Sequence, residues 1–92
     1  MVSGTFAANG SSAEHYATCA GDFPLTIHGT WRSCTAKLYI KIPGGSVWHA
    51  MEDGAWTANA DQMIRAIEGA RYKLTLSGAG SPIPALEYCF GI

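Results

Sequence analysis

The 92-residue sequence carries little charge, and neither sign predominates. Charged residues make up 14% of the chain, and six Lys and Arg against seven Asp and Glu leave a net charge of -1. With so little positive charge we expect no basic stripe that could neutralise phosphates, and hence no nucleic-acid partner. A weakly charged surface on a small apolar domain instead favours self-association or a permanent protein partner.

The sequence also has no long apolar run and no closely spaced pair of cysteines. No stretch approaches the roughly 18 apolar residues of a membrane span, and residues 1–8 have neither the basic nor the apolar region of a secretory signal. We therefore expect no membrane partner and synthesis in a cytosol. The three cysteines, Cys19, Cys34 and Cys89, lie far apart. Their odd number predicts reduced thiols that are not all paired, with one bridge left open.

Apolar residues are plentiful by comparison. They make up 48% of the chain and include three Trp, four Tyr and three Phe, which is enough for one core and excludes a disordered polar tail. We expect a single domain over residues 1–92. A domain of this size buries only about 60 to 65% of its unfolded surface, so it has little stability to spare.

Short alternating runs cut by turn residues predict an all-β fold. We expect an antiparallel β-sandwich or a jelly-roll-like domain of about seven to eight short strands. The clearest strands are 36–42 and 71–77, in which apolar and polar side chains alternate. The other strands are expected at 2–8, 14–20, 24–28, 47–51, 55–58 and 85–92. The expected core residues are Leu38, Ile40, Leu74, Leu76, Tyr88 and Phe90.

Turn signals set the expected connections. Asn9-Gly10 predicts a two-residue hairpin between the first two strands, because both residues tolerate positive φ. Residues 43–45 end one strand and start a hairpin, and Gly29 indicates a bulge or a tight turn. Asp53-Gly54 predicts a further turn, which would put Trp48 and Trp56 on consecutive strands.

Residues 59–68 allow two interpretations. Asn59 could cap a short helix that buries Met63 and Ile64 and ends at Gly69. A strand is favoured because every neighbouring segment is predicted to be a strand, but both alternatives stay open.

Residue types that carry chemistry do not form a recognisable constellation. His15, His28 and His49 lack the spacing of a metal chelate. Glu52 and Asp53 are adjacent, so on a strand they would point to opposite faces and could not act as an acid and base pair. No serine lies in a nucleophile-elbow pattern. We expect no enzyme, no metal and no cofactor.

The aromatic side chains are the candidate interaction residues. Trp31, Trp48, Trp56 and Tyr39 are the positions at which we expect an interface. For each tryptophan we favour a core position over an interface position. Trp48 and Trp56 would either stack as a cross-strand pair or leave one ring exposed as an anchor for a sugar or a protein.

A series of turns and aromatics resembles that of small all-β bacteriophage virion proteins. The likeness covers nearly the whole chain and is carried by residues 8–12, 21–25, 29–31, 43–48, 54–58, 68–69 and 72–78. One departure is Ile42-Pro43, which stands where such proteins usually have an acidic residue before the Gly-Gly turn. The resemblance therefore implies no ion site at this turn.

The resemblance implies a mechanical role in the virion. Proteins of this kind are commonly capsid decoration or cement proteins, or accessory parts of the head, neck or tail, and they have no catalytic residues to carry over. It implies assembly in the host cytoplasm, a homotrimer, and the major capsid protein or another virion protein as partner. A carbohydrate-binding β-sandwich that recognises a host surface is the alternative, because exposed Trp and Tyr beside polar turns are suited to sugars.

Overall fold

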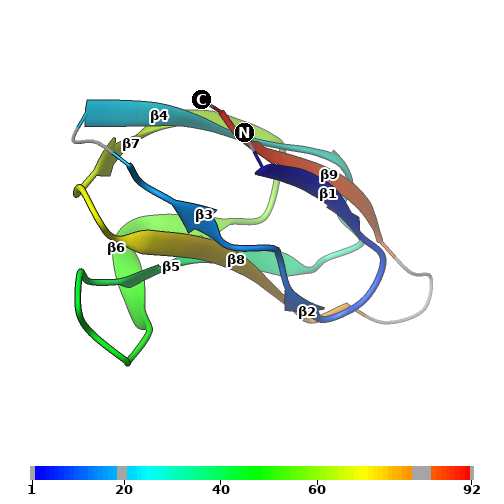
Figure 1. Cartoon of the computed structure of the whole chain (residues 1–92). Helices are drawn as coiled ribbons and strands as arrows, with labels where there is room; N and C mark the ends of the chain where they lie inside the picture. Colours follow the sequence, from blue (N-terminus) through cyan, green and yellow to red (C-terminus); the bar gives the residue numbers. More distant parts are fainter. Residues whose placement is uncertain (1, 19–20, 80–83, 92) are drawn as a thin grey trace.

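The computed structural model describes residues 2–18, 21–79 and 84–91, and they form two layers of strands (Figure 1). The nine strands are β1 (Val2–Phe6), β2 (Gly10–Ser11), β3 (His15–Tyr16), β4 (Gly21–Thr30), β5 (Thr35–Lys41), β6 (His49–Trp56), β7 (Ala60–Ala66), β8 (Arg71–Ser77) and β9 (Ala85–Phe90). Within these ranges no helix is long and apolar enough to cross a bilayer. The all-β prediction is confirmed.

The strands form two antiparallel sheets that face each other. Sheet 1 has the order β1-β9-β4-β7, and sheet 2 has the order β2-β8-β5-β6, with β3 also paired to β8. β2 and β3 pair with opposite ends of β8 and so act as one interrupted edge strand. The nine strands therefore fill eight strand positions.

The pairing is that of a jelly roll. β1 pairs with β9, β2 and β3 with β8, β4 with β7, and β5 with β6, all antiparallel. The chain is thus one long hairpin folded at the β5–β6 connection. Rolling this hairpin brings β9 beside β4 and β8 beside β5, which yields the two-sheet arrangement of an eight-strand jelly roll.

The core lies between the sheets and follows the alternation in the sequence. On β8 every second side chain is buried, and the same holds on β4 and β9. Of the expected core residues, Ile40 is only partly buried, and Leu38, Leu74, Leu76, Tyr88 and Phe90 are buried. Each fully buried aliphatic or aromatic side chain contributes about 1.5 to 3 kcal/mol relative to its exposed state.

The expected hairpin at Asn9-Gly10 is wrong. β1 pairs with β9 in sheet 1, whereas β2 pairs with β8 in sheet 2. The two residues instead lead the chain from one sheet to the other, and Asn9 Oδ1 accepts a hydrogen bond of 2.8 Å from the Ala79 N–H. A local turn signal does not select a partner strand, and here more distant strands satisfy both edges.

The expected turn at Asp53-Gly54 is also wrong, because β6 continues through both residues to Trp56. The register between β5 and β6 shifts between Lys37 and Tyr39, so the extra residues of β6 form a bulge. Trp48 therefore immediately precedes the strand whose last residue is Trp56, and the two tryptophans are not on consecutive strands.

Two strand boundaries near Pro24 differ from the expectation. Of the strand expected at 14–20, the described residues 14–18 contain only the short strand His15–Tyr16, and β4 begins at Gly21, before Pro24. The Pro24 carbonyl accepts a hydrogen bond of 2.8 Å from the Gly91 N–H, just beyond the end of β9. The position that lacks an N–H thus faces the end of the neighbouring strand, where proline is tolerated.

The described residues answer two questions that the sequence leaves open, the secondary structure of residues 59–68 and the state of the cysteines. Residues 60–66 form β7, so the strand interpretation is confirmed. Gly69, with φ of 87°, lies in the turn to β8 rather than at a helix end. Cys34 and Cys89 are free thiols, and Cys19 lies outside the described residues.

Candidate functional site

The outer face of sheet 2 gathers most of the positive charge of the chain. Lys37 and Lys41 alternate with buried residues of β5, and Arg71 and Lys73 alternate with buried residues of β8. These four cations are four of the six in the sequence. The register brings the two strands together, because Lys41 pairs with Arg71, and Lys73 pairs with Tyr39.

Aromatic rings flank these cations at both edges of the sheet. Tyr16 on β3 pairs with Arg71, whose Cζ lies 4.8 Å from the centre of the Tyr16 ring. At the other edge, the Trp48 ring centre lies 5.2 Å from Lys41 Nζ and 4.5 Å from Lys73 Nζ. Because Lys73 is on β8 and Trp48 precedes β6, the two side chains meet above β5, which lies between them.

We call this surface the cationic face. It consists of Tyr16, Lys37, Tyr39, Lys41, Trp48, Arg71, Lys73 and Thr75. The recorded ion pair on it joins Arg71 to Glu14, whose charged atoms are 3.7 Å apart. Both side chains are about half exposed, so this pair stabilises the fold by little.

The sequence-based premise that no basic stripe exists is wrong. A net charge of -1 averages over the whole chain, whereas the pairing of β5 with β8 concentrates Lys37, Lys41, Arg71 and Lys73 on one face. Alternation within each strand predicts which of its side chains point outward. It does not predict that these side chains lie together on one face, because that depends on which strands become neighbours.

A second feature is an apolar end of the sandwich. Ile42 and Val47 lie in the β5–β6 loop and Ile67 in the turn after β7, and all three side chains are about half exposed or more. Loop and turn are in contact, because a Cβ added to Gly69 would lie 3.4 Å from the Pro43 Cβ. Figure 1 shows both connections at the same end of the molecule. Ile42, Val47 and Ile67 are called the apolar end below.

The four expected interface residues fall into different environments. Tyr39 and Trp48 are both on the cationic face and partly buried. Trp56 pairs with Ala36 on the inner side of sheet 2 and packs against the core. Trp31 is 9% exposed and belongs to the core. The structure thus brings two of the four together and leaves Trp31 unavailable to a partner.

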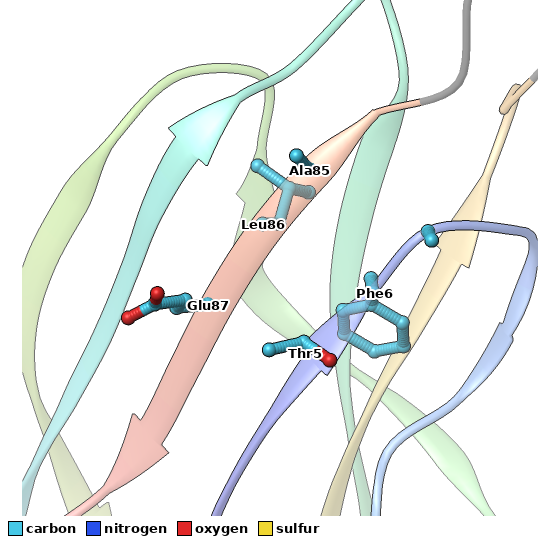
Figure 2. A pocket seen from close by; sticks show the side chains of 6 residues that line it. Thr5, Phe6, Ala85, Leu86 and Glu87 are labelled. Carbon is cyan, nitrogen blue, oxygen red and sulfur yellow. The ribbon is translucent and has the colours of Figure 1, made fainter.

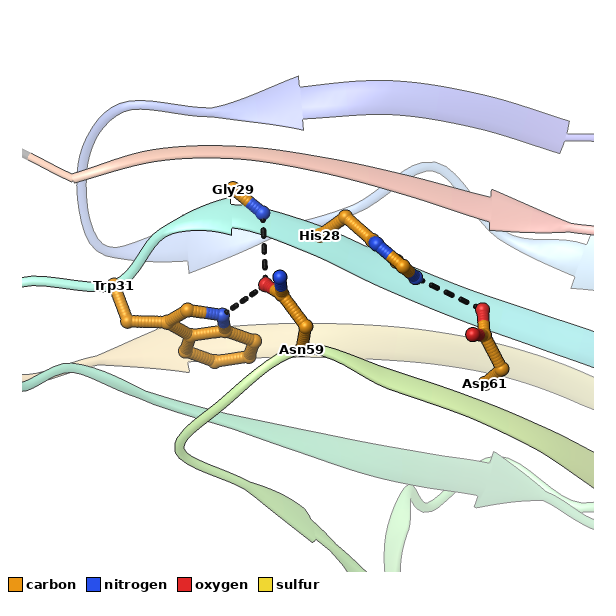
Figure 3. A network of polar contacts seen from close by, with 5 residues as sticks. All are labelled: His28, Gly29, Trp31, Asn59 and Asp61. Carbon is orange, nitrogen blue, oxygen red and sulfur yellow. Dashed lines mark hydrogen bonds and ion pairs between the residues drawn. The ribbon is translucent and has the colours of Figure 1, made fainter.

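Trp31 is held in place by a polar network between β4 and β7. Asn59 Oδ1 accepts hydrogen bonds of 2.9 Å from Trp31 Nε1 and from the Gly29 N–H (Figure 3). Beside them, His28 Nε2 and Asp61 Oδ1 are 2.9 Å apart on the exposed face of sheet 1. The network satisfies the indole N–H of a buried tryptophan, so its role is structural.

A shallow depression lies where β1 and β9 run side by side. Its lining includes Thr5, Phe6, Ala85, Leu86 and Glu87 (Figure 2). Glu87 is the one ionisable side chain in this lining. Across the residues that the structure describes, no three His, Cys, Asp or Glu side chains are grouped so as to hold a metal ion.

The buried histidine belongs to the core. His15 stacks on Phe90 with ring centres 5.5 Å apart and planes at 6°, and its ring centre lies 4.7 Å from that of Phe23. Burial lowers the pKa of His15 below its ordinary value, because an imidazolium would lose its hydration among these rings. The folded state therefore holds His15 in its neutral form near neutral pH.

This pKa shift predicts a loss of stability in mild acid. Because the folded pKa lies below the unfolded one, the stabilisation is complete above about pH 6.5 and is lost as the pH falls through the folded value. We expect the melting temperature to fall between pH 7.5 and pH 5. In His15→Phe the fall should be smaller, whereas exposed His49→Gln should behave like the parent. Equal falls in the parent and His15→Phe would contradict the assignment.

Comparison with known proteins identifies no relative of this chain. No protein-family model matches the chain, and searches of curated proteins and of solved structures find no match.

Proposed function

We propose that this protein is a structural virion protein of a bacteriophage that decorates the capsid and braces the coat-protein lattice. The apolar end carries the proposal: Ile42, Val47 and Ile67 are exposed on a loop and a turn that are in contact at one end of the sandwich. Exposed apolar side chains that cluster mark interaction sites. The resemblance to small phage virion proteins supplies the kind of assembly, and a neck or tail position is the closest variant of it.

Copies of the chain would meet at the apolar end and form a trimer. The association buries side chains that one domain leaves in water, and three linked copies bind a lattice of identical sites more tightly than one copy does. Binding only the expanded lattice would stabilise that state by mass action. Jelly rolls occur in capsid and lectin domains, so the fold is compatible with this role but does not decide it.

Light scattering tests the trimer. We expect the parent to have a trimer mass at micromolar concentration, and Val47→Asp combined with Ile67→Asp to have a monomer mass, because buried unpaired carboxylates are costly. Met63→Asp is the matched control, since Met63 is 58% exposed but lies on β7, outside the apolar end. This control should remain a trimer. A parent that is a monomer would contradict the trimer.

Binding to capsids tests the role itself. Purified protein would be mixed with expanded empty phage capsids, and co-sedimentation and electron microscopy would locate added density. We expect density at symmetry-related positions for the parent and for Met63→Asp, and none for the double variant. A trimer that leaves the capsids bare would contradict the decoration role and favour a neck or tail position. A monomer that also leaves them bare would contradict both.

A further inference from the structure

We propose that the cationic face binds an acidic oligosaccharide, a chain of sugar rings that carry carboxylate or sulfate groups. This site shares no residue with the apolar end, although Lys41 and Trp48 adjoin Ile42 and Val47 in the chain, and it does not rest on the virion role. The proposal draws on three features of the face: a row of cations, aromatic rings beside them, and exposed hydroxyl groups.

The row runs across all strands of sheet 2. Tyr16 pairs with Arg71 and Arg71 with Lys41. Trp48 follows at the far edge, since His49 pairs with Ile40. With strands about 4.8 Å apart, the backbone positions of Tyr16 and Trp48 are roughly 14 Å apart. Both rings contact cations of the inner strands, so an extended ligand of a few sugar rings can contact both aromatic rings and the cations beside them.

The aromatic rings provide an apolar surface on which a sugar ring can pack. The apolar side of a pyranose packs on the face of Trp or Tyr, and the polar groups then meet neighbouring donors. The ammonium groups of Lys41 and Lys73 lie over the Trp48 ring, so a sugar that packs against the rest of this indole has both within reach of its acidic group. Charge-assisted hydrogen bonds of this kind are about twice as strong as neutral ones.

Hydroxyl groups continue the face beyond the cations. Thr75 pairs with Lys37 on one side and with Ser11 on the other. Ser11 Oγ and Thr75 Oγ1 are 3.2 Å apart and this pair is exposed to solvent. Hydroxyl groups donate and accept, so they can exchange their mutual hydrogen bond for bonds to sugar hydroxyls.

Arg71 has an acidic neighbour. Glu14 lies 3.7 Å away in an exposed geometry. Such pairs are worth little, so a ligand carboxylate can replace Glu14 at small cost. Lys41 and Lys73 face the Trp48 ring instead.

Nucleic acid is the other polymer that combines rings with negative charge, and the chain favours it less. The face holds four cations, one of which is paired with Glu14, whereas a nucleic-acid site follows the phosphate backbone along a positively charged groove. A short uronate oligosaccharide carries one charge on each sugar ring and needs fewer cations. The exposed hydroxyl pair also suits the hydroxyl groups of a sugar.

Calorimetric titration of the purified protein at low salt tests the proposal. The probes are tetragalacturonate and a heparin tetrasaccharide as acidic ligands, maltotetraose as the neutral ligand, and a 12-nucleotide oligothymidylate. We expect at least one acidic tetrasaccharide to bind, and maltotetraose to bind at least about tenfold more weakly. Lys41→Gln with Lys73→Gln should weaken acidic binding by about tenfold or more, and so should Trp48→Ala.

The matched control is Arg32→Gln with Arg65→Gln, which removes the same charge. Both arginines are exposed, and they lie in the turn after β4 and on β7, outside the cationic face. This control should bind like the parent within about twofold. Melting curves of all variants would verify that each is folded under the conditions of the titration.

Four results would overturn the proposal. They are no binding of either acidic tetrasaccharide at millimolar concentration, equal binding of maltotetraose, equal weakening in the control variant, and tighter binding of oligothymidylate. The last result would assign the face to nucleic acid. Because the titration uses neither capsids nor the apolar end, its failure leaves the decoration role unaffected, and the reverse also holds.

Discussion

Replacing Leu74 with Ala is expected to lower the free energy of unfolding by about 2 to 5 kcal/mol. Leu74 is fully buried in the middle of β8, which pairs with β5 on one side and with the interrupted edge strand on the other. Its N–H donates to Ser12 Oγ, and its carbonyl accepts from the Ser12 N–H. With the backbone held on both sides, the strand cannot move inward to fill the cavity.

Urea and thermal unfolding measure this effect. A small domain loses about 4 to 8 °C of melting temperature for each kcal/mol, and total stabilities are only about 5 to 15 kcal/mol. Exposed Met63→Ala on β7 is the matched control and should change stability by about 0.5 kcal/mol or less. If Leu74→Ala melted like the parent, the assignment of the inner face of β8 would be wrong.

A second large effect is expected from Gly29→Ala. Gly29 has φ of 144°, and a Cβ there would collide with the Ala85 carbonyl oxygen and lie 2.9 Å from the Leu86 Cα. Both are backbone atoms of β9, so relief requires β4 and β9 to separate where they pair. Backbone strain and overpacking each cost about 1 to 3 kcal/mol, and we expect a destabilisation of roughly 2 to 4 kcal/mol.

Gly21→Ala measures the conformational part of this effect, and its difference from Gly29→Ala gives the steric part. Gly21 begins the same strand with φ of 127°, but nothing lies within 4 Å of a Cβ built there. It should be affected by its backbone conformation alone and so lose less stability than Gly29→Ala. Equal losses in urea unfolding would show that contact with β9 is not what requires glycine at position 29.

Alternation along the sequence was sufficient to predict most strands and the inner faces of the central ones. β8 and β9 have the buried positions expected at Leu74, Leu76, Tyr88 and Phe90. This works because side chains on a strand alternate strictly, so the buried set can be read within one segment. Ile40 is the exception, since it lies next to the last residue of β5 and is only partly buried.

The connections were less predictable, since a turn signal is local and strand pairing is not. Asn9-Gly10 has the composition of a hairpin turn but joins two sheets, and Asp53-Gly54 lies in a bulge of β6. The cationic face was missed for the same reason. Lys41 and Arg71 are thirty positions apart in the numbering, and only the pairing of β5 with β8 makes them neighbours.

The rolled hairpin also determines when the fold can form. Val2 pairs with Phe90, so β1 finds its partner only in the last strand to be synthesised among those described. Strands with such distant partners fold slowly, because closing the long loop between them costs conformational entropy before the stabilising contacts form. On the ribosome β4 likewise lacks its neighbour β9 until residues 85–90 have been made. The sandwich can therefore close only after β9 has been synthesised, and until then the apolar faces of its early strands depend on dilution or on chaperones to stay apart.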